Sequence, residues 1–104
     1  MKRSEIVQTV RKIIRRTAPD ATIILYGSEA RGEARANSDI DLLILLNKDK
    51  LSILDKDEIR YPIYELELET GVHVSPLIYT QKEWANRPFK TPFYINVMKE
   101  GIML

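Results

Sequence analysis

Apolar positions in the first half of the chain follow first a helical and then an extended pattern. Over residues 6–17 they recur at spacings of three and four, which predicts an amphipathic helix with Ser4 as its N-cap and an end before Pro19. Residues 22–26 are apolar and β-branched on both faces, which predicts a central strand that is covered on both sides. Residues 39–46 (DIDLLILL) predict a second buried strand.

The polar segments around these strands predict short connections and one long helix. Residues 29–36 are rich in helix formers, so we expect one or two helical turns, broken by the Asn37-Ser38 pair. A turn follows the second strand, and residues 52–70 predict a helix with Gly71 as its C-cap. Pro62 lies inside this helix, so we expect either a kink or a helix that starts near the proline.

The last third of the chain predicts two more strands and two short helices. Residues 72–79 read as a strand, and Pro76 within it favours an edge position. Residues 80–84 begin with the Thr-x-x-Glu pattern of a capping box and predict a short helix that ends at the Asn-Arg-Pro sequence after it. Residues 91–101 start with Thr-Pro and end with Gly, as a helix does, and residues 102–104 predict a final short strand. The whole order predicts an α/β or α+β fold, with helices flanking a small mixed sheet in a single domain over residues 1–104.

Composition excludes several classes of protein. The 104 residues suffice for one core, and 44% hydrophobic with 30% charged residues is ordinary for a globular protein. The net charge of +1 gives no reason to expect binding to nucleic acid or a membrane, although the basic face of the first helix leaves nucleic acid as a rival partner. Without cysteine there is no disulfide or thiolate site, and no apolar run is long enough for a membrane span, so we expect a cytoplasmic protein.

The candidate chemistry lies between the first two predicted strands. Asp39 and Asp41 are two residues apart on a predicted strand, so their side chains should share a face and repel each other unless a cation compensates. Mg²⁺ and Mn²⁺ prefer oxygen ligands, commonly one or two carboxylates with phosphate oxygens. Gly27-Ser28 follows the first strand at a strand-to-helix turn, where glycine permits a close backbone approach to a phosphate. If the strands are neighbours, both features meet at one end of the sheet, as metal-dependent nucleotidyl transfer requires.

This segment carries a family resemblance. The string GSEARGEARANSDID over residues 27–41 has Gly-Ser, ten residues and then Asp-x-Asp, and it resembles the signature of minimal nucleotidyltransferases in the DNA polymerase β-like superfamily. The resemblance extends over nearly the whole chain. It implies that Asp39 and Asp41 bind Mg²⁺ or Mn²⁺ and that Gly27 and Ser28 bind the phosphates of ATP. Arg31 would either contact phosphate or pair with a nearby acidic residue.

The resemblance also implies a function and a partner. Many minimal nucleotidyltransferases are antitoxins paired with a small helical toxin of the HEPN class, and some transfer AMP from ATP to the partner. We therefore expect nucleoside monophosphate transfer to a hydroxyl of a HEPN-type protein, with no membrane partner and with homo-oligomer formation left open. Trp84, Phe89, Phe93 and Tyr94 could form a surface for that partner, but in a small chain we assign them to the core and its edge.

One position departs from the family pattern. Active members carry a third carboxylate in a sequence like Gly-Val-x-Val-Asp, whereas residues 71–75 read Gly-Val-His-Val-Ser. A neutral hydroxyl at Ser75 cannot hold a metal as a carboxylate does, and it is a poor base without a partner. His73 or one of three glutamates (Glu65, Glu67 and Glu69, which we expect to be mostly solvated) could compensate. The general base stays unassigned, and the alternative function is a catalytically weak module that neutralises its partner by binding.

Overall fold

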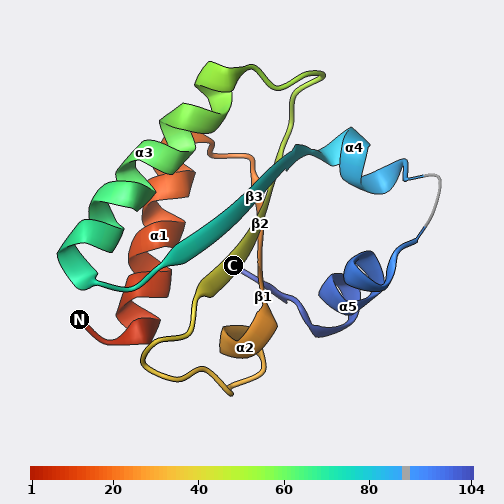
Figure 1. Cartoon of the computed structure of the whole chain (residues 1–104). Helices are drawn as coiled ribbons and strands as arrows, with labels where there is room; N and C mark the ends of the chain where they lie inside the picture. The colour runs from red at the N-terminus through yellow and green to blue at the C-terminus, as the bar shows by residue number, and fades with distance from the viewer. Residues whose placement is uncertain (88–89) are drawn as a thin grey trace.

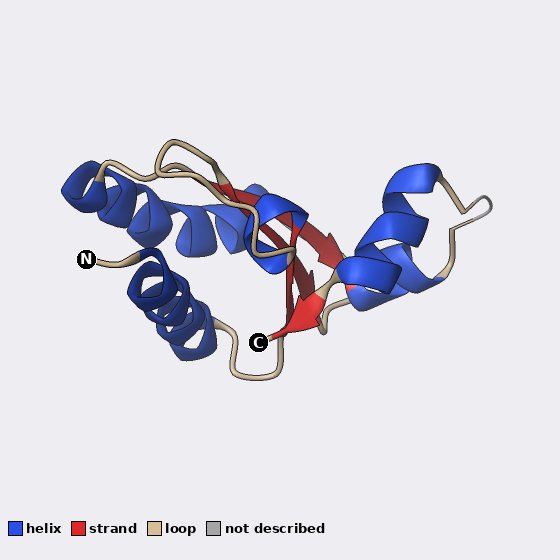
Figure 2. Ribbon diagram, turned by 90° about the horizontal axis from the view of Figure 1, so that it is seen from below, coloured by secondary structure: helices blue, strands red, loops and turns tan. Residues whose placement is uncertain are grey.

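The fold is a four-stranded mixed sheet with helices on both faces (Figures 1 and 2). The computed structural model describes residues 1–87 and 90–104; Pro88 and Phe89, for which we predicted a helix break and a core-edge aromatic, lie outside that range. The strand order is β3-β2-β1-β4. In chain order the elements are α1 (Arg3–Thr17), β1 (Thr22–Tyr26), α2 (Gly27–Ala30), β2 (Ile40–Leu46), α3 (Ile53–Thr70), β3 (Val74–Thr80), α4 (Gln81–Ala85), α5 (Pro92–Glu100) and β4 (Ile102–Met103).

Strand pairing brings three strand ends to one end of the sheet. β1 is antiparallel to β2 and pairs Tyr26 with Asp41. β2 is parallel to β3 and pairs Asp41 with Ser75. The carboxyl end of β1 and the amino ends of β2 and β3 therefore lie side by side (Figure 1).

Two separate cores cover the two faces of the sheet. One face packs against α1 and α3, which lie next to each other, and the other faces α4 and α5 (Figure 2). β2 serves both cores because its side chains alternate: Leu42 and Ile44 are buried under α1 and α3, whereas Leu43 and Leu45 pack with Trp84. Asp41 shares the face of Leu43 and Leu45. β1 likewise contributes to both cores between β2 and β4, so the predicted central, two-sided strand is confirmed.

Helix α1 begins earlier than predicted. Its N-cap is Lys2, not Ser4, and it ends at Thr17, ahead of Pro19 as expected. The Glu5 carboxylate accepts a hydrogen bond from the Lys2 backbone N–H at 3.3 Å. Arg3 is fixed by an ion pair with Glu29 at 2.8 Å, which draws the first helical residue toward α2. The start of α1 thus combines a local bond between Lys2 and Glu5 with a tertiary contact that the local sequence does not reveal.

The predicted helix over residues 29–36 is wrong beyond its first two residues. α2 covers Gly27–Ala30, and the chain then turns at Gly32, whose φ of +71° lies in the left-handed region. The rest of this segment is a loop, in which the Ser38 hydroxyl accepts a hydrogen bond from the Arg35 backbone at 2.9 Å. A local hydrogen bond of this kind competes with helix formation.

The strands after this loop start one to two residues later than predicted. β2 begins at Ile40, so Asp39 lies just before the strand, and β3 begins at Val74 and extends to Thr80. The Val74 N–H donates to the Glu67 carboxylate at 2.7 Å. This backbone group is therefore satisfied by a side chain and not by a neighbouring strand. β3 is an edge strand, as Pro76 led us to expect.

Most of the remaining expectations about helices are confirmed. α3 runs continuously through Pro62, which excludes a start near that proline, and Gly71 caps it at a φ of +71°. Thr80 and Glu83 form the expected capping box of α4, and Thr91 caps α5. Over residues 1–87 and 90–104, no helix is both long and apolar enough to cross a membrane.

Candidate active site

The Gly-Ser pair and the Asp-x-Asp pair meet at the sheet end where β1 stops and β2 starts. Gly27 has a φ of +75°, which favours glycine. A Cβ atom on Gly27 would collide with Oδ2 of Asp41 and would lie 3.3 Å from its Cγ. The Gly27 backbone therefore packs directly on the Asp41 carboxylate, and only glycine permits this approach. The two halves of the predicted site are in contact.

The Asp41 carboxylate is half-buried, and it is electrostatically unfavourable as an anion. Burial raises the pKa of Asp41, and the neighbouring charge of Asp39 raises it further, while His73 and Arg31 act in the opposite direction. Burial, together with the nearby Asp41 and Tyr79, also raises the pKa of the Tyr26 hydroxyl to about 12, so Tyr26 stays protonated at neutral pH. A site with two adjacent carboxylates and an uncompensated negative charge fits a divalent cation.

The described residues supply only part of a metal shell. Across residues 1–87 and 90–104, no three His, Asp or Glu side chains are grouped closely enough to hold a metal ion. Asp39 and Asp41 could provide two oxygen donors, and phosphate and water would have to supply the others, an arrangement that suits Mg²⁺. Ser28 is half-buried, and its hydroxyl makes no hydrogen bond within the described part of the chain, which leaves it available to a phosphate.

Arg31 is paired with acidic side chains. Its guanidinium donates to Glu33 at 3.1 Å and to Glu100 at 3.3 Å, so it joins the end of α2 to the end of α5. Both bonds raise the pKa of Arg31 further. Of the two roles expected for Arg31, the structure thus shows pairing with acidic residues, while the influence of Arg31 on Asp41 places its charge near the site.

Ser75 and His73 lie at the same sheet end but in different surroundings. Ser75, the position where the family resemblance leads us to expect a third carboxylate, pairs directly with Asp41 across the parallel strands. His73 precedes β3, and its Nδ1 lies 2.9 Å from Oε1 of Glu67 on α3. The structure therefore brings His73 within electrostatic range of Asp41 but not into a metal-binding group with it.

Sequence reasoning missed the role of Glu67. We expected the glutamates of α3 to be mostly solvated, which holds for Glu65 and Glu69 but not for Glu67, whose side chain is only 17% exposed. It binds both His73 and the Val74 backbone. A signal was present, because Glu67 follows the buried Ile63 by four residues and so lies on the inner side of the helix.

A hollow of about 220 Å³ borders Gly27 on the α5 side of the sheet. The rings of Tyr26 and Phe93 meet edge to face in it, with centroids 5.5 Å apart. The hollow is lined by Tyr26, Gly27, Arg31, Phe93, Asn96, Val97 and Glu100. It offers aromatic surface and one amide next to the candidate phosphate site.

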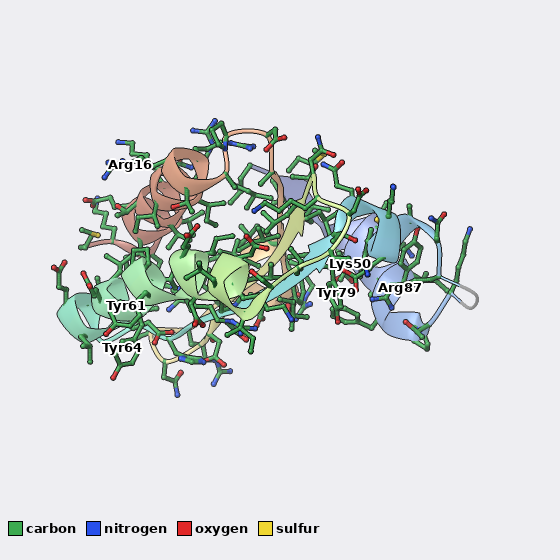
Figure 3. The ribbon with its side chains drawn as sticks, turned by 90° about the horizontal axis from the view of Figure 1, so that it is seen from above. Arg16, Lys50, Tyr61, Tyr64, Tyr79 and Arg87 are labelled. Carbon is green, nitrogen blue, oxygen red and sulfur yellow. The ribbon has the colours of Figure 1, made fainter. Side chains whose placement is uncertain are left out.

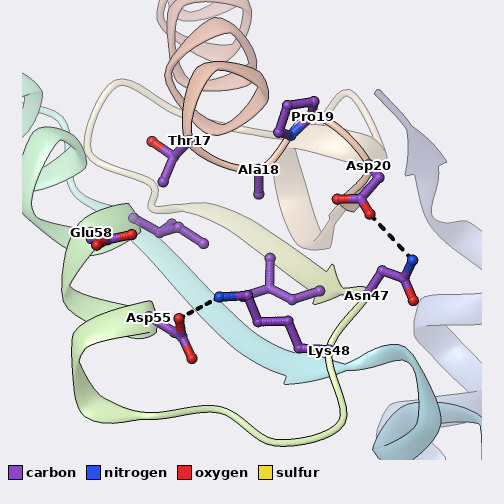
Figure 4. A pocket seen from close by; sticks show the side chains of 10 residues that line it. Thr17, Ala18, Pro19, Asp20, Asn47, Lys48, Asp55 and Glu58 are labelled. Atoms are coloured by element: carbon purple, nitrogen blue, oxygen red, sulfur yellow. Dashed lines mark hydrogen bonds and ion pairs between the residues drawn. The ribbon is translucent and has the colours of Figure 1, made fainter.

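The smaller pocket in Figure 4 is unrelated to this chemistry. It has about 120 Å³ and lies where β2 ends, at the opposite end of the sheet from Asp41. Its walls include a hydrogen bond from Asn47 to Asp20 at 3.2 Å and an ion pair between Lys48 and Asp55 at 2.5 Å (Figure 4).

The aromatic residues behave as core and core-edge residues where the structure describes them. Trp84 is buried, and its ring lies 4.8 Å from that of Tyr94 and 6.2 Å from that of Phe93, measured between centroids. Arg87 stacks on Trp84 with its guanidinium carbon 4.4 Å from the ring centroid, beside Tyr79 (Figure 3). Phe93 is partly exposed at the edge of this cluster.

Comparison with known proteins identifies the family. Residues 7–104 match the family model described as a nucleotidyltransferase domain. A protein of Methanocaldococcus jannaschii, provisionally named a protein adenylyltransferase, is 31% identical over 94% of this chain and 94% of its own length. The Haemophilus influenzae protein MntA, which carries the same provisional name, is 32% identical over 79% of this chain and 71% of its own length.

Solved structures agree with this assignment. A structure provisionally described as a minimal nucleotidyltransferase superposes with a TM-score of 0.59 at 29% identity, over 98% of this chain and 91% of its own. A chain from the MntA–HpeT toxin–antitoxin complex gives a TM-score of 0.61 over 94% of this chain and 70% of its own; at 23% identity it supports the fold alone. The matched domain, the shared fold and the contact between Gly27 and Asp41 lead to one conclusion: the chain belongs to the nucleotidyltransferase domain family.

Proposed function

We propose that this chain transfers AMP from ATP to a hydroxyl of a protein partner, as the antitoxin of a HEPN-type toxin. The observation that carries the proposal is the packing of the Gly27 backbone on the Asp41 carboxylate. It makes the phosphate loop and the acidic pair into one site. Relatives named as protein adenylyltransferases, 31% and 32% identical to this chain, support the reaction type.

Asp39 and Asp41 would hold the Mg²⁺ or Mn²⁺ ion. A divalent cation at this position supplies positive charge to the triphosphate and to the charge that develops during transfer. The raised pKa of Asp41 supports this assignment, because the carboxylate gains most from a cation that its neighbours do not provide. Gly27 and Ser28 would bind the phosphates through the backbone and the hydroxyl.

The nucleoside would occupy the hollow beside Gly27. It borders the phosphate site, and its wall combines two aromatic rings with the Asn96 amide, a mixture of apolar surface and a few polar groups that is typical of ligand sites. The amide could hydrogen-bond a base. This placement keeps the opposite side of Asp41, toward Ser75 and β3, open to the acceptor.

A second function is favoured by Ser75. Because Ser75 stands beside Asp41 where a third carboxylate would lie, the chain could bind ATP and metal and neutralise its partner by masking it, with little or no transfer. The two functions share the fold, the nucleotide site and the partner, and differ only in turnover.

Labelled ATP distinguishes them. The protein is incubated with α-phosphate-labelled ATP, Mg²⁺ or Mn²⁺ and the protein encoded by the neighbouring gene. Metal-dependent label on the partner, lost in Asp39→Ala, is the expected result. Protection of the partner that persists in Asp39→Ala without any label would sink the catalytic proposal and leave the masking function.

A further inference from the structure

Helix α3 is apolar on two opposite sides. One side, with Ile59, Ile63 and Leu66, is buried against the sheet. The other carries a row that we call the outer stripe, with these exposed fractions: Leu54 66%, Tyr61 68%, Tyr64 55% and Leu68 69%. Exposed apolar side chains that gather in one row mark an interaction surface, so the outer stripe indicates a surface that another molecule covers.

The spacing of the outer stripe fits a helix as its partner. Its residues are separated by seven, three and four positions, the repeat that places side chains in one seam against a facing helix, and Asp57 occupies the seam position between Leu54 and Tyr61. The uninterrupted apolar part of the seam therefore runs from Tyr61 to Leu68. Tyr61 and Tyr64 point outward on the side of α3 away from α1 (Figure 3). Tyrosine is enriched at interfaces, because it adds apolar area while its hydroxyl stays solvated.

Charges beside the outer stripe decide which helix can dock. The exposed charged residues in and beside the outer stripe are acidic with one exception, Arg60 on one edge: Asp57 lies in the seam, and Glu58, Glu65 and Glu69 lie along the other edge. In an antiparallel pair of two α3 helices centred on Tyr61, Leu54 would face Leu68, but Asp57 would face Glu65. That juxtaposition of like charges opposes a second copy of this chain.

The outer stripe also leads to the candidate active site. Tyr64 lines a groove of about 190 Å³ between α3 and β3, together with Arg60, Glu67, His73 and Pro76. His73 lies at the amino end of β3, where Ser75 pairs with Asp41. A helix on the outer stripe would therefore hold its own molecule beside the side of the site that the acceptor must approach.

We propose that the outer stripe of α3 docks an amphipathic helix of a different protein, one with an apolar seam flanked by lysine and arginine. The proposal rests on the proposed function in one respect, since it places the acceptor protein. It adds the surface used and the charge of the partner, which the transfer reaction does not specify.

Two labelled three-heptad peptides test this surface. Both have leucine at the seam positions, and one carries lysine at the flanking positions where the other carries glutamate. Fluorescence anisotropy measures their binding to the wild-type protein, to Tyr61→Glu and to Leu68→Glu. Met98→Glu is the matched control, because Met98 on α5 is an exposed apolar residue (55%) that lies outside the outer stripe. ATP·Mn²⁺ binding is measured on every variant, and on Asp41→Ala.

The expected result is that the basic peptide binds the wild type about tenfold or more tightly than the acidic one, with a loss of affinity at high salt. Tyr61→Glu and Leu68→Glu should abolish peptide binding but keep ATP·Mn²⁺ binding, and Met98→Glu should keep both. Equal binding of the two peptides, unchanged binding in both stripe variants, or a wild-type dimer that Leu68→Glu dissociates would overturn the proposal. A wild type that binds ATP·Mn²⁺ but neither peptide contradicts the docking surface alone. Failure of the wild type to bind ATP·Mn²⁺ contradicts the proposed function instead.

Discussion

Gly27 and Asp41 set the geometry of the site at the scale of single residues. The glycine is required for two reasons, its left-handed φ and the carboxylate against its Cα. Gly71 has nearly the same φ of +71° but has no atom within 4 Å of an added Cβ. Comparing Gly27 with Gly71 therefore separates the free-energy cost of the left-handed backbone from the cost of a collision between a Cβ atom and Asp41.

Gly27→Ala should therefore impair the site more than Gly71→Ala does. Both variants should lose about 1–2 kcal/mol of unfolding free energy, from the left-handed conformation. Only Gly27→Ala should also weaken ATP·Mn²⁺ binding, by about tenfold or more, because its methyl group displaces the Asp41 carboxylate. Urea unfolding and calorimetric titration measure the two effects. Equal affinity in the two variants would show that Gly27 does not position Asp41.

Asp41 should destabilise the protein when no metal is present. Burial and Asp39 raise its pKa, so ionising it at neutral pH costs more in the folded than in the unfolded state. Asp41→Asn should then raise the melting temperature at pH 7 without metal. The gain should vanish as the pH falls below the ordinary pKa of 3.8, where Asp41 is protonated in both states.

Metal should reverse this difference. Mg²⁺ with ATP should stabilise the wild type and leave Asp41→Asn nearly unchanged, because binding to the folded state alone adds stability. Melting curves at pH 7 and pH 3, with and without Mg²⁺ and ATP, test both effects. If Asp41→Asn is less stable than the wild type at pH 7 without metal, the ionised Asp41 carboxylate does not destabilise the fold.

At the scale of secondary-structure elements, α3 shows what a local sequence pattern can fix. The predicted start at residue 52 agrees with a local capping box, in which Ser52 and Asp55 exchange hydrogen bonds at 2.9 and 3.1 Å. Lys48 adds an ion pair, and these bonds to Lys48 and Ser52 lower the pKa of the Asp55 carboxyl to about 2.

Asp55→Asn should lower stability at pH 7. Since its folded-state pKa is depressed, the contribution of Asp55 is present above the ordinary value of 3.8 and is lost as the pH falls toward 2. Asp57→Asn is the control, an exposed acid on the same helix two residues further on. Melting temperatures from pH 7 to pH 2 should converge for Asp55→Asn and the wild type. A deficit that persists at pH 2 would point to packing instead of charge.

The predicted boundaries of helices and strands were wrong where a residue outside the local pattern binds the end of the element. The first residue of α1, Arg3, forms an ion pair with Glu29, and the first residue of β3, Val74, donates its backbone N–H to Glu67. Neither contact is encoded in a local pattern. The caps of α4 and α5 were predictable because both partners of each bond lie within one helical turn.

At the scale of the whole molecule, strand register joins parts of the sequence that are 15 and 34 residues from Asp41. Tyr26 precedes Gly27 and pairs with Asp41 from one side, and Ser75 pairs with it from the other. The sequence predicted that the Gly-Ser and Asp-x-Asp pairs are candidate site residues. It predicted that they meet only on the condition that their strands are neighbours. The partnership of His73 with Glu67 depends on how α3 lies over the sheet, which periodicity alone does not specify.

The central claim is that this site is complete except for the carboxylate that Ser75 replaces. The most direct test is the rate of AMP transfer from α-labelled ATP to the neighbouring gene's product, compared among wild type, Asp41→Ala and Ser75→Asp. We expect Asp41→Ala to abolish transfer and Ser75→Asp to raise it about tenfold or more, because a third carboxylate adds a metal ligand beside the acceptor. Transfer that is unaffected by Asp41→Ala, or absent in both wild type and Ser75→Asp, would contradict the claim.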